Sequence, residues 1–182
     1  VHEWIAVDAQ GRLELEGEDG LRAALARDPE SIALVTALWA NNEVGTLQPV
    51  EAIAAAAGAH SVPLHLDAVA AYGQVPLDVH AVGAAAVSIS AHKIGGPVGI
   101  GALYLARDAQ LEALLHGGDQ QRGRSGTMDA AGAHVFGLAA HAATDNLAAH
   151  AMELAALRDR LVAGVTGAPY GTAAAPDHAG ID

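Results

Sequence analysis

The feature that most constrains the fold is the alternation of short apolar runs with longer alanine-rich segments. Ile32–Leu38 is a continuous apolar run with β-branched residues, which is typical of a strand buried on both faces. Further strands are expected at Trp4–Asp8, Val62–Leu66, Ala86–Ile89 and Ala102–Ala106. Alternation of strands and helices favours a parallel sheet with right-handed crossovers. The pattern therefore predicts an α/β layered fold.

Helices are expected between and after these runs. Pro49 stands where helices often begin, directly before an alanine-rich segment. The expected helices are Leu21–Arg27, Val50–Ala59 and Ala109–Leu115. One long Ala/Leu-rich helical pattern then runs from Asp129 to about Val165, and Thr127 is a candidate N-cap for it.

Composition excludes several classes of function. The net charge of −12 opposes binding to a phosphate backbone, so a nucleic-acid module is not expected. The chain has no charge-free run of about 18 apolar residues and no secretory leader pattern, which predicts a cytoplasmic protein without a membrane span. It has no cysteine, so this sequence itself can supply no disulfide, thiolate metal ligand or cysteine nucleophile.

Three polar clusters follow expected strands. Asn41–Glu43 follows the first buried run, Asp67 follows the next, and Ser90–Lys93 follows the run after that. Ligands of open α/β sheets bind beyond the carboxyl ends of the strands, so a carboxylate and an amine there can face each other across a ligand. Alternatively, Asp67 caps a helical turn and Lys93 is a solvated loop residue. The residues alone leave both interpretations open.

A metal site is a further possibility at one of these clusters. His65 and Asp67 are two residues apart in an expected strand and share a face, which suits metal ligation, and His60 is nearby in sequence. No third ligand is spaced to complete a site, so no metal is expected.

The order and spacing of several motifs identify a family resemblance. The chain resembles the cysteine desulfurases, within the class V aminotransferase-like group of enzymes that use pyridoxal 5'-phosphate (PLP). The matching motifs are NNEVG (Asn41–Gly45), HLDA (His65–Ala68), SISAHKIGGP (Ser88–Pro97), GIGALY (Gly99–Tyr104) and HGGDQQRGRSGT (His116–Thr127). This resemblance implies a three-layer α/β/α fold, the fold type I of PLP-dependent transferases, present as an incomplete large domain.

The resemblance also implies roles for individual residues. Lys93 resembles the catalytic lysine that binds PLP covalently, a role that suits an amine able to add to a carbonyl. Asp67 resembles the carboxylate that pairs with the pyridine nitrogen and keeps it protonated. Ser90 and His92 resemble the pair that binds the cofactor phosphate, although His92 can also be a structural loop residue.

Two more residues match positions of the family motifs. Asn42 resembles the asparagine near the ring hydroxyl and the substrate carboxylate, whereas Asn41 beside it reads as a turn residue. Thr127 resembles a threonine that reaches the phosphate of the partner subunit, which implies a homodimer. A simple helix N-cap is an equally good interpretation of Thr127, and the two roles can coexist.

The sequence departs from the family pattern in two respects. Ala70 stands where the family commonly has a glutamine that donates to the ring hydroxyl, so the substrate is less certain than the cofactor. The family's upstream phosphate loop and ring-stacking histidine, and its downstream cysteine and substrate-binding arginine, are not in this sequence. Residues 1–165 are therefore expected to be the middle and end of the large domain, and residues 166–182 the start of a small domain.

These observations predict the central fragment of a cysteine desulfurase. The parent enzyme would convert L-cysteine to L-alanine and pass sulfur, as a persulfide, to its own cysteine and then to an acceptor protein. Such enzymes supply sulfur for iron–sulfur cluster assembly. The alternatives are another class V PLP enzyme, such as a selenocysteine lyase or an aminotransferase, and a truncated remnant without catalysis.

Overall fold

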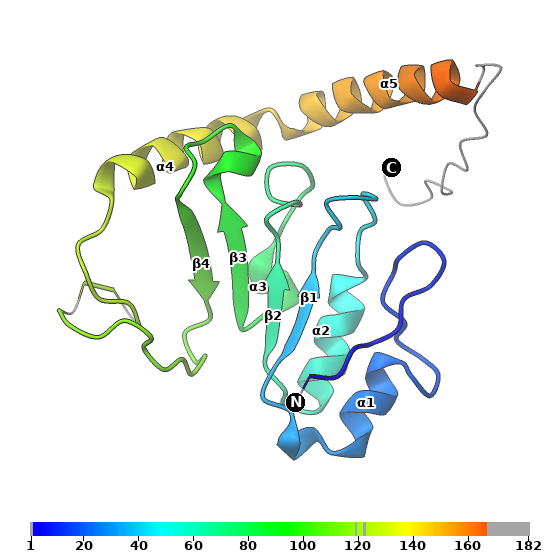
Figure 1. Cartoon of the computed structure of the whole chain (residues 1–182), viewed down its shortest axis with the longest axis vertical. Helices are drawn as coiled ribbons and strands as arrows, with labels where there is room; N and C mark the ends of the chain where they lie inside the picture. Colours follow the sequence, from blue (N-terminus) through cyan, green and yellow to red (C-terminus); the bar gives the residue numbers. More distant parts are fainter. Residues whose placement is uncertain (1, 119, 122, 167–182) are drawn as a thin grey trace.

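A mixed four-stranded sheet organises the part of the chain that the structure describes. The computed structural model describes residues 2–118, 120–121 and 123–166. The strands are β1 (Val35–Leu38), β2 (Leu64–Asp67), β3 (Ala86–Ser90) and β4 (Gly101–Leu105), and they lie in the order β1-β2-β3-β4 (Figure 1). Four of the five expected strands are thus confirmed, with ends displaced by up to three residues.

The last strand corrects the expectation of a fully parallel sheet. β1, β2 and β3 are parallel, but β4 pairs antiparallel with β3, Ser90 opposite Gly101. A parallel connection needs a crossover of a dozen or more residues, and the segment between Ser90 and Gly101 is shorter than that. The chain therefore reverses through the short 3-10 helix η2 (Ala91–Ile94) and returns beside β3.

Three helices cover one face of the sheet. They are α1 (Leu21–Arg27), α2 (Val50–Ala59) and the one-turn α3 (Val79–Val82), and a 3-10 turn, η1 (Pro29–Ser31), follows α1. Leu25 and Ile53 from this layer are fully buried together with Leu66 and Val87 from the strands. Burial of such side chains contributes roughly 1.5–3 kcal/mol each. α1 and α2 match their expected bounds, whereas α3, only four residues long, was not expected.

The opposite face of the sheet carries more polar and more exposed side chains. Side chains alternate between the faces of a strand, so Thr36, Leu38, His65, Asp67 and Ser88 share this second face. Thr36 and Leu38 are exposed, and the other three are half-buried. We call this surface the open face.

The long C-terminal helical pattern is divided. α4 (Ala130–Asp145) and α5 (Leu147–Thr166) are separated at Asn146, so the expectation of one continuous helix is wrong. The Asn146 side chain donates to Ala142 O at 2.9 Å, a side-chain bond to the backbone of the kind that favours helix ends. α4 packs against η2, which follows the carboxyl end of β3, and α5 continues from α4 along the top of the view in Figure 1.

Three local expectations are wrong. The N-cap of α4 is Asp129, whose carboxylate accepts from Gly132 N at 2.8 Å, and not Thr127. Trp4–Asp8 forms no strand; Val7 makes one isolated bridge to Leu13, and Trp4 is 91% exposed. The segment 109–115 forms no helix. Its leucines are exposed, and a short helix without a packed face is marginal in water.

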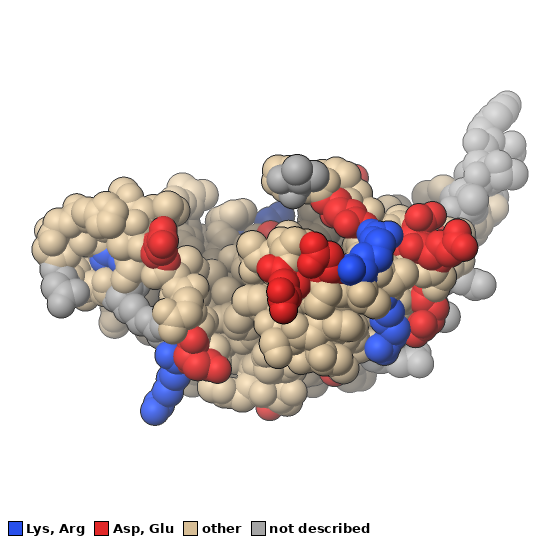
Figure 2. All heavy atoms as spheres, turned by 90° about the horizontal axis from the view of Figure 1, so that it is seen from below, with Lys and Arg blue, Asp and Glu red and all other residues tan. Residues whose placement is uncertain are grey.

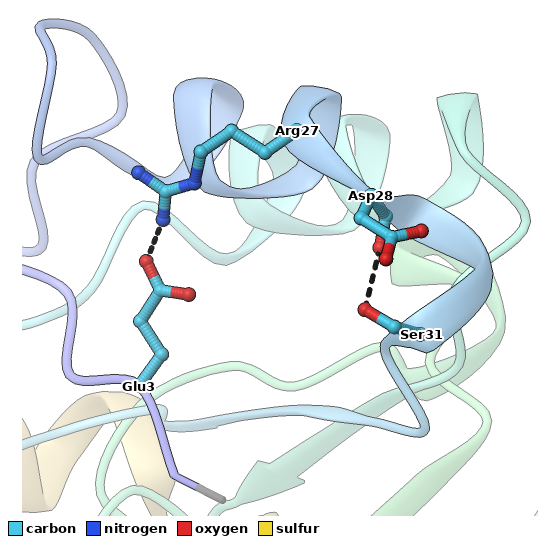
Figure 3. Close-up of polar contacts among 4 residues, drawn as sticks. All are labelled: Glu3, Arg27, Asp28 and Ser31. Atoms are coloured by element: carbon cyan, nitrogen blue, oxygen red, sulfur yellow. Dashed lines mark hydrogen bonds and ion pairs between the residues drawn. The ribbon is translucent and has the colours of Figure 1, made fainter.

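Polar contacts hold the N-terminal segment and the end of α1. Arg27 pairs with Glu3, and the Ser31 hydroxyl donates to Asp28 O at 2.9 Å (Figure 3). Figure 2 views the molecule from the amino ends of the parallel strands, and its Lys and Arg side chains are interspersed among Asp and Glu. Among the described helices, none is long and apolar enough to cross a membrane. Location in the cytoplasm stays a prediction.

Candidate functional site

Most of the candidate residues gather at the carboxyl ends of three neighbouring parallel strands. Asp67 is the last residue of β2 and Ser90 the last residue of β3, while Asn42 lies in the turn that follows β1. In the register of the sheet, Asp67 is paired with Leu38 on one side and with Ser88 on the other. This edge is where ligands bind in open α/β sheets.

The backbone around Asp67 is fixed on both sides. Trp39 N donates to Asp67 O at 2.8 Å, and Ala68 N donates to Ser88 O at 2.9 Å. The Asp67 side chain is half-buried, and its Oδ1 accepts from Val69 N at 2.9 Å. Among the described residues, Oδ2 has no hydrogen-bond donor. A carboxylate with one occupied and one available oxygen can pair with a cationic ring nitrogen.

The serine, histidine and lysine of the third cluster lie on one tight turn. Ser90 Oγ lies 2.7 Å from His92 Nδ1, and Lys93 follows on the exposed side of η2. Gly95 ends η2 in the left-handed conformation, with φ of 79°, which favours glycine. Gly96 N donates back to Ala91 O at 2.9 Å. The turn thus presents a hydroxyl, an imidazole and an amine on one short, hydrogen-bonded segment.

Lys93 is the only lysine in the whole sequence. The other basic residues of the Lys and Arg total are arginines, which stay protonated in proteins and do not add to carbonyls. The ion pairs among the described residues join Arg22 to Glu16, Arg27 to Glu3, His141 to Asp145 and Arg158 to Asp159. None of them involves Lys93. This composition signal was available in the sequence and strengthens the choice of this residue.

The turn that carries Asn42 is stabilised by its neighbour and by a distant glutamine. Asn41 Oδ1 accepts from Glu43 N at 2.8 Å and from Val44 N at 3.0 Å, which confirms Asn41 as a turn residue. Asn42 itself is exposed. Sequence reasoning missed Gln48, which comes just before the expected start of α2 and gave no local signal.

Gln48 links this turn to residues 6–14, where the chain folds back so that Val7 bridges Leu13; we call this segment the N-terminal hairpin. Its Oε1 accepts from Leu13 N at 2.8 Å, and its Nε2 donates to Gly11 O at 2.8 Å. The Thr46 hydroxyl donates to Gln10 O at 2.6 Å. The hairpin therefore supports the loop between β1 and α2 that holds Asn42.

Thr127 is separate from this cluster. It is exposed in the segment before α4, and within the described residues no hydrogen bond joins it to the other candidate residues. Its proposed contact across a dimer interface involves a second copy of the chain and stays a prediction.

The histidine considered as a metal ligand is engaged in hydrogen bonds. His65 Nδ1 lies 2.8 Å from Thr36 Oγ1, and His65 Nε2 lies 2.8 Å from Ser88 Oγ. His60 ends α2 at its C-cap. In the described part of the chain, no three His, Asp or Glu side chains are placed to hold a metal ion.

Comparison with known proteins finds cysteine desulfurases among the relatives of the chain. The family model described as aminotransferase class-V matches residues 2–175. The chain is 45% identical to an IscS-like cysteine desulfurase of Mycobacterium tuberculosis, over 89% of this chain and 40% of that protein. It is 42% identical to the cysteine desulfurase NifS of Azotobacter vinelandii, over 88% of this chain and 39% of that protein.

Solved structures agree with the sequence comparison. A NifS-like protein from Rickettsia africae superposes with a TM-score of 0.84 at 33% identity, over 91% of this chain and 45% of that chain. DndA from Streptomyces lividans has a TM-score of 0.78 at 32% identity, over 91% of this chain and 47% of that chain. The chain thus spans less than half the length of these relatives. The expected fold type I of PLP-dependent enzymes is confirmed, and the chain belongs to the class V aminotransferase family.

Proposed function

We propose that this chain is the cofactor-binding part of a PLP-dependent cysteine desulfurase. The observation that carries the proposal is the position of Asp67 and of the Lys93 turn at the carboxyl ends of the adjacent parallel strands β2 and β3. The class V aminotransferase match and the cysteine desulfurase names of the relatives support it. Bound PLP would supply an electron-withdrawing ring that stabilises negative charge at the substrate α-carbon.

In this proposal, Lys93 binds the aldehyde group of the cofactor and Asp67 binds its ring nitrogen. The Lys93 amine would hold PLP through the aldehyde carbon of the cofactor, whose oxygen would leave as water, and the chain has no other lysine to compete for it. Asp67 Oδ2, which accepts no bond among the described residues, pairs with the protonated ring nitrogen while Oδ1 remains bonded to Val69 N. The carboxylate thereby keeps the ring nitrogen charged.

The remaining residues orient the cofactor and the substrate. Ser90 and His92 bind phosphate oxygens from the turn after β3, and the hydrogen bond between them limits their rotation. Asn42 donates its amide to the ring hydroxyl or to the substrate carboxylate. Thr127 adds a phosphate contact to the neighbouring subunit, so we propose that the enzyme acts as a homodimer.

The proposed reaction converts L-cysteine to L-alanine. The sulfur is accepted as a persulfide by a cysteine of the enzyme, which lies outside this sequence, and is then passed to an acceptor protein. Iron–sulfur cluster assembly is the proposed use of that sulfur, and the cytoplasm the proposed location.

A second substrate is favoured by one residue. Ala70 is half-buried just after Asp67, and a methyl group cannot donate to the ring hydroxyl as the family's glutamine does. Loss of this donor changes the protonation of the cofactor, which can alter the choice of reaction. We therefore keep two alternative substrates: L-selenocysteine, for a lyase, and another amino acid, for an aminotransferase.

A spectroscopic titration tests the proposal. PLP is added to the purified chain and its near-ultraviolet absorption is recorded, first alone and then with L-cysteine, L-selenocysteine or L-aspartate. We expect a new protein-dependent band that L-cysteine alters more than L-aspartate does. A PLP spectrum unchanged by the protein would contradict cofactor binding, and an equal or greater response to L-aspartate would favour an aminotransferase.

Lys93→Ala is the control for this titration. It removes the only side-chain amine of the chain while leaving Asp67 and Ser90 in place. The protein-dependent band should be lost in the variant. A band of equal intensity in Lys93→Ala would place the bond elsewhere and contradict the role of this lysine.

A further inference from the structure

A row of three hydrogen-bonded side chains crosses the open face of the sheet. Thr36 on β1 bonds to Nδ1 of His65 on β2, and Nε2 of the same ring bonds to Ser88 on β3, each at 2.8 Å. His65 is the only member in contact with both others. Its imidazole is thus bound on both sides, by side chains from the two strands that flank β2.

The row lies two residues before the strand ends that carry the candidate site. His65 and Asp67 occupy the same face of β2, two residues and roughly 6.6 Å apart along the strand. Ser88 is the register partner of Asp67 and precedes Ser90 by two residues. Thr36 is on the strand that leads toward Asn42. The row therefore joins the three strands whose ends carry the cofactor residues.

The chemistry of the row allows it to stay bonded in either neutral form of the ring. A neutral imidazole has one donor and one acceptor nitrogen, and a hydroxyl can donate or accept. Whichever nitrogen carries the proton, one hydroxyl accepts from the ring and the other donates to it. The link between strands is thus kept without requiring one tautomer.

We propose that His65 is a positioning residue for the cofactor site. Through Thr36 and Ser88, it holds the end of β2, and with it Asp67, in fixed register against the ends of β1 and β3. This role rests on the proposed function, because Asp67 is its target as the partner of the PLP ring nitrogen. The hydrogen bond to Ser88 matters more for cofactor binding than the hydrogen bond to Thr36, because the Lys93 turn follows β3.

Substitutions of His65 can separate the hydrogen bond to Thr36 from the hydrogen bond to Ser88. The amide of Asn lies near the position of Nδ1, so His65→Asn keeps a partner for Thr36, whereas the longer His65→Gln reaches the position of Nε2 and keeps one for Ser88. His65→Phe keeps the ring shape and removes both bonds. We expect PLP affinity to fall about fivefold to tenfold in His65→Phe and His65→Asn, and less than twofold in His65→Gln.

A second histidine serves as the matched control. His80 is exposed on α3, and its ring packs edge-on against Tyr104, with Nδ1 3.4 Å from the tyrosine hydroxyl. His80→Phe therefore removes a histidine hydrogen bond away from the strand ends. It should leave PLP affinity within twofold. Affinity losses that follow melting temperature alone across all four variants would show a merely structural role and overturn the inference.

A measurement without cofactor keeps this test separate from the proposed function. The amides of Trp39 and Ala68 bond to Asp67 O and Ser88 O at the strand ends, so their hydrogen exchange reports the register that His65 is proposed to hold. In the cofactor-free chain, His65→Phe should speed their exchange about tenfold relative to amides in α2. Unchanged exchange would overturn the inference, whether or not PLP binds. Faster exchange in His65→Phe, combined with a wild-type chain that binds no PLP, would support the role of His65 between the strands and contradict only the proposed function.

Discussion

Ser90 Oγ lies 2.7 Å from His92 Nδ1, so two side chains from one short turn restrain each other before any ligand is bound. The bond leaves Nε2 of His92 available, since no second contact to this ring is found among the described residues. Groups restrained in this way lose less conformational entropy when they bind. The pair at the end of β3 is thus suited to an anion such as a phosphate.

Replacement of Ser90 tests this assignment. Ser90→Ala removes one donor and frees the His92 ring, so PLP affinity should fall about tenfold or more, because hydrogen bonds to charged groups are worth roughly 1.5–3 kcal/mol. Pyridoxal, which lacks the phosphate, should bind the variant and the wild type equally. Absorbance titrations with both compounds provide the measurement. Equal losses for PLP and pyridoxal would contradict a phosphate contact.

Asp67→Asn separates the charge of this residue from its structural role. The amide oxygen can still accept from Val69 N, so the midpoint of urea unfolding should change little. PLP affinity should fall about tenfold and the spectrum of the bound cofactor should change, because a neutral amide does not stabilise a protonated ring nitrogen. Asp78→Asn is the control, since Asp78 caps α3 by accepting from two backbone amides. Similar spectra for the two variants would contradict the role of Asp67.

Gly73 supports the Lys93 turn by lacking a side chain. It has φ of 75°, and an added Cβ would lie 2.6 Å from Ile94 Cγ2 and 3.1 Å from Ala143 Cβ. Gly73→Ala should therefore lower the free energy of unfolding by roughly 1–3 kcal/mol and move Ile94, the residue after Lys93. Gly58→Ala in α2 is the control, because among the described residues no atom outside its own turn of helix lies within 4 Å of its added Cβ. That control should raise stability by up to about 1 kcal/mol. Chemical denaturation measures both, and equal stability of the two variants would contradict the packing argument.

Gln48 should determine how firmly the Asn42 turn is held. Gln48→Leu removes both bonds to the N-terminal hairpin, and Gln48→Glu keeps an acceptor for Leu13 N but loses the donor to Gly11 O. The cost should be roughly 1–3 kcal/mol for Leu and less for Glu, because unpaired backbone groups then lose their partners. The hydrogen-exchange rate of residues 41–47 should rise more in Gln48→Leu than in Gln48→Glu. Exchange that does not respond in either variant would show that the hairpin does not support this loop.

The chain alone should not release sulfur from L-cysteine. The proposed sulfur acceptor is a cysteine thiolate, and the sequence contains no cysteine. With PLP and L-cysteine, alanine formation should stay at the level of PLP without protein, as measured by amino-acid analysis. Alanine above that level would mean that sulfur leaves by a route that needs no thiol of the chain.

The sequence predicts those parts of the fold that depend on neighbouring residues. Leu64–Asp67 is a strand with one buried face, and Val35–Leu38 is a strand whose two faces are half-buried and exposed, although its apolar run is typical of burial on both faces. α2 starts directly after Pro49, as its proline signal indicates. The direction of β4 depends on the length of the preceding turn, and α4 ends at Asn146, whose side chain donates to Ala142 O. The helix expected at 109–115 does not form, and the leucines of this segment are exposed rather than packed.

The candidate site likewise has residues that the sequence predicts and contacts that it does not. Asn42, Asp67 and the segment from Ser90 to Lys93 lie in contiguous motifs, and the sheet brings these motifs to one edge. The contacts of Gln48 with Gly11 and Leu13 join residues distant in sequence, and those of His65 cross two strand pairs. Nothing local in the sequence indicates such partners. The role of Thr127 and the small-domain segment stay predictions, and residues 167–182 lie outside the described part.

Covalent capture of the cofactor is the most direct test of the proposed function. The chain is incubated with PLP, reduced with borohydride and digested, and the modified peptide is identified by mass spectrometry. Because Lys93 is the only lysine, the N-terminal amine is the one other amine that can be labelled. We expect the label on the peptide that contains Lys93, and its loss in Asp67→Asn at limiting PLP. A label confined to the N-terminal amine, or no label at all, would contradict the proposal that this chain binds PLP through Lys93.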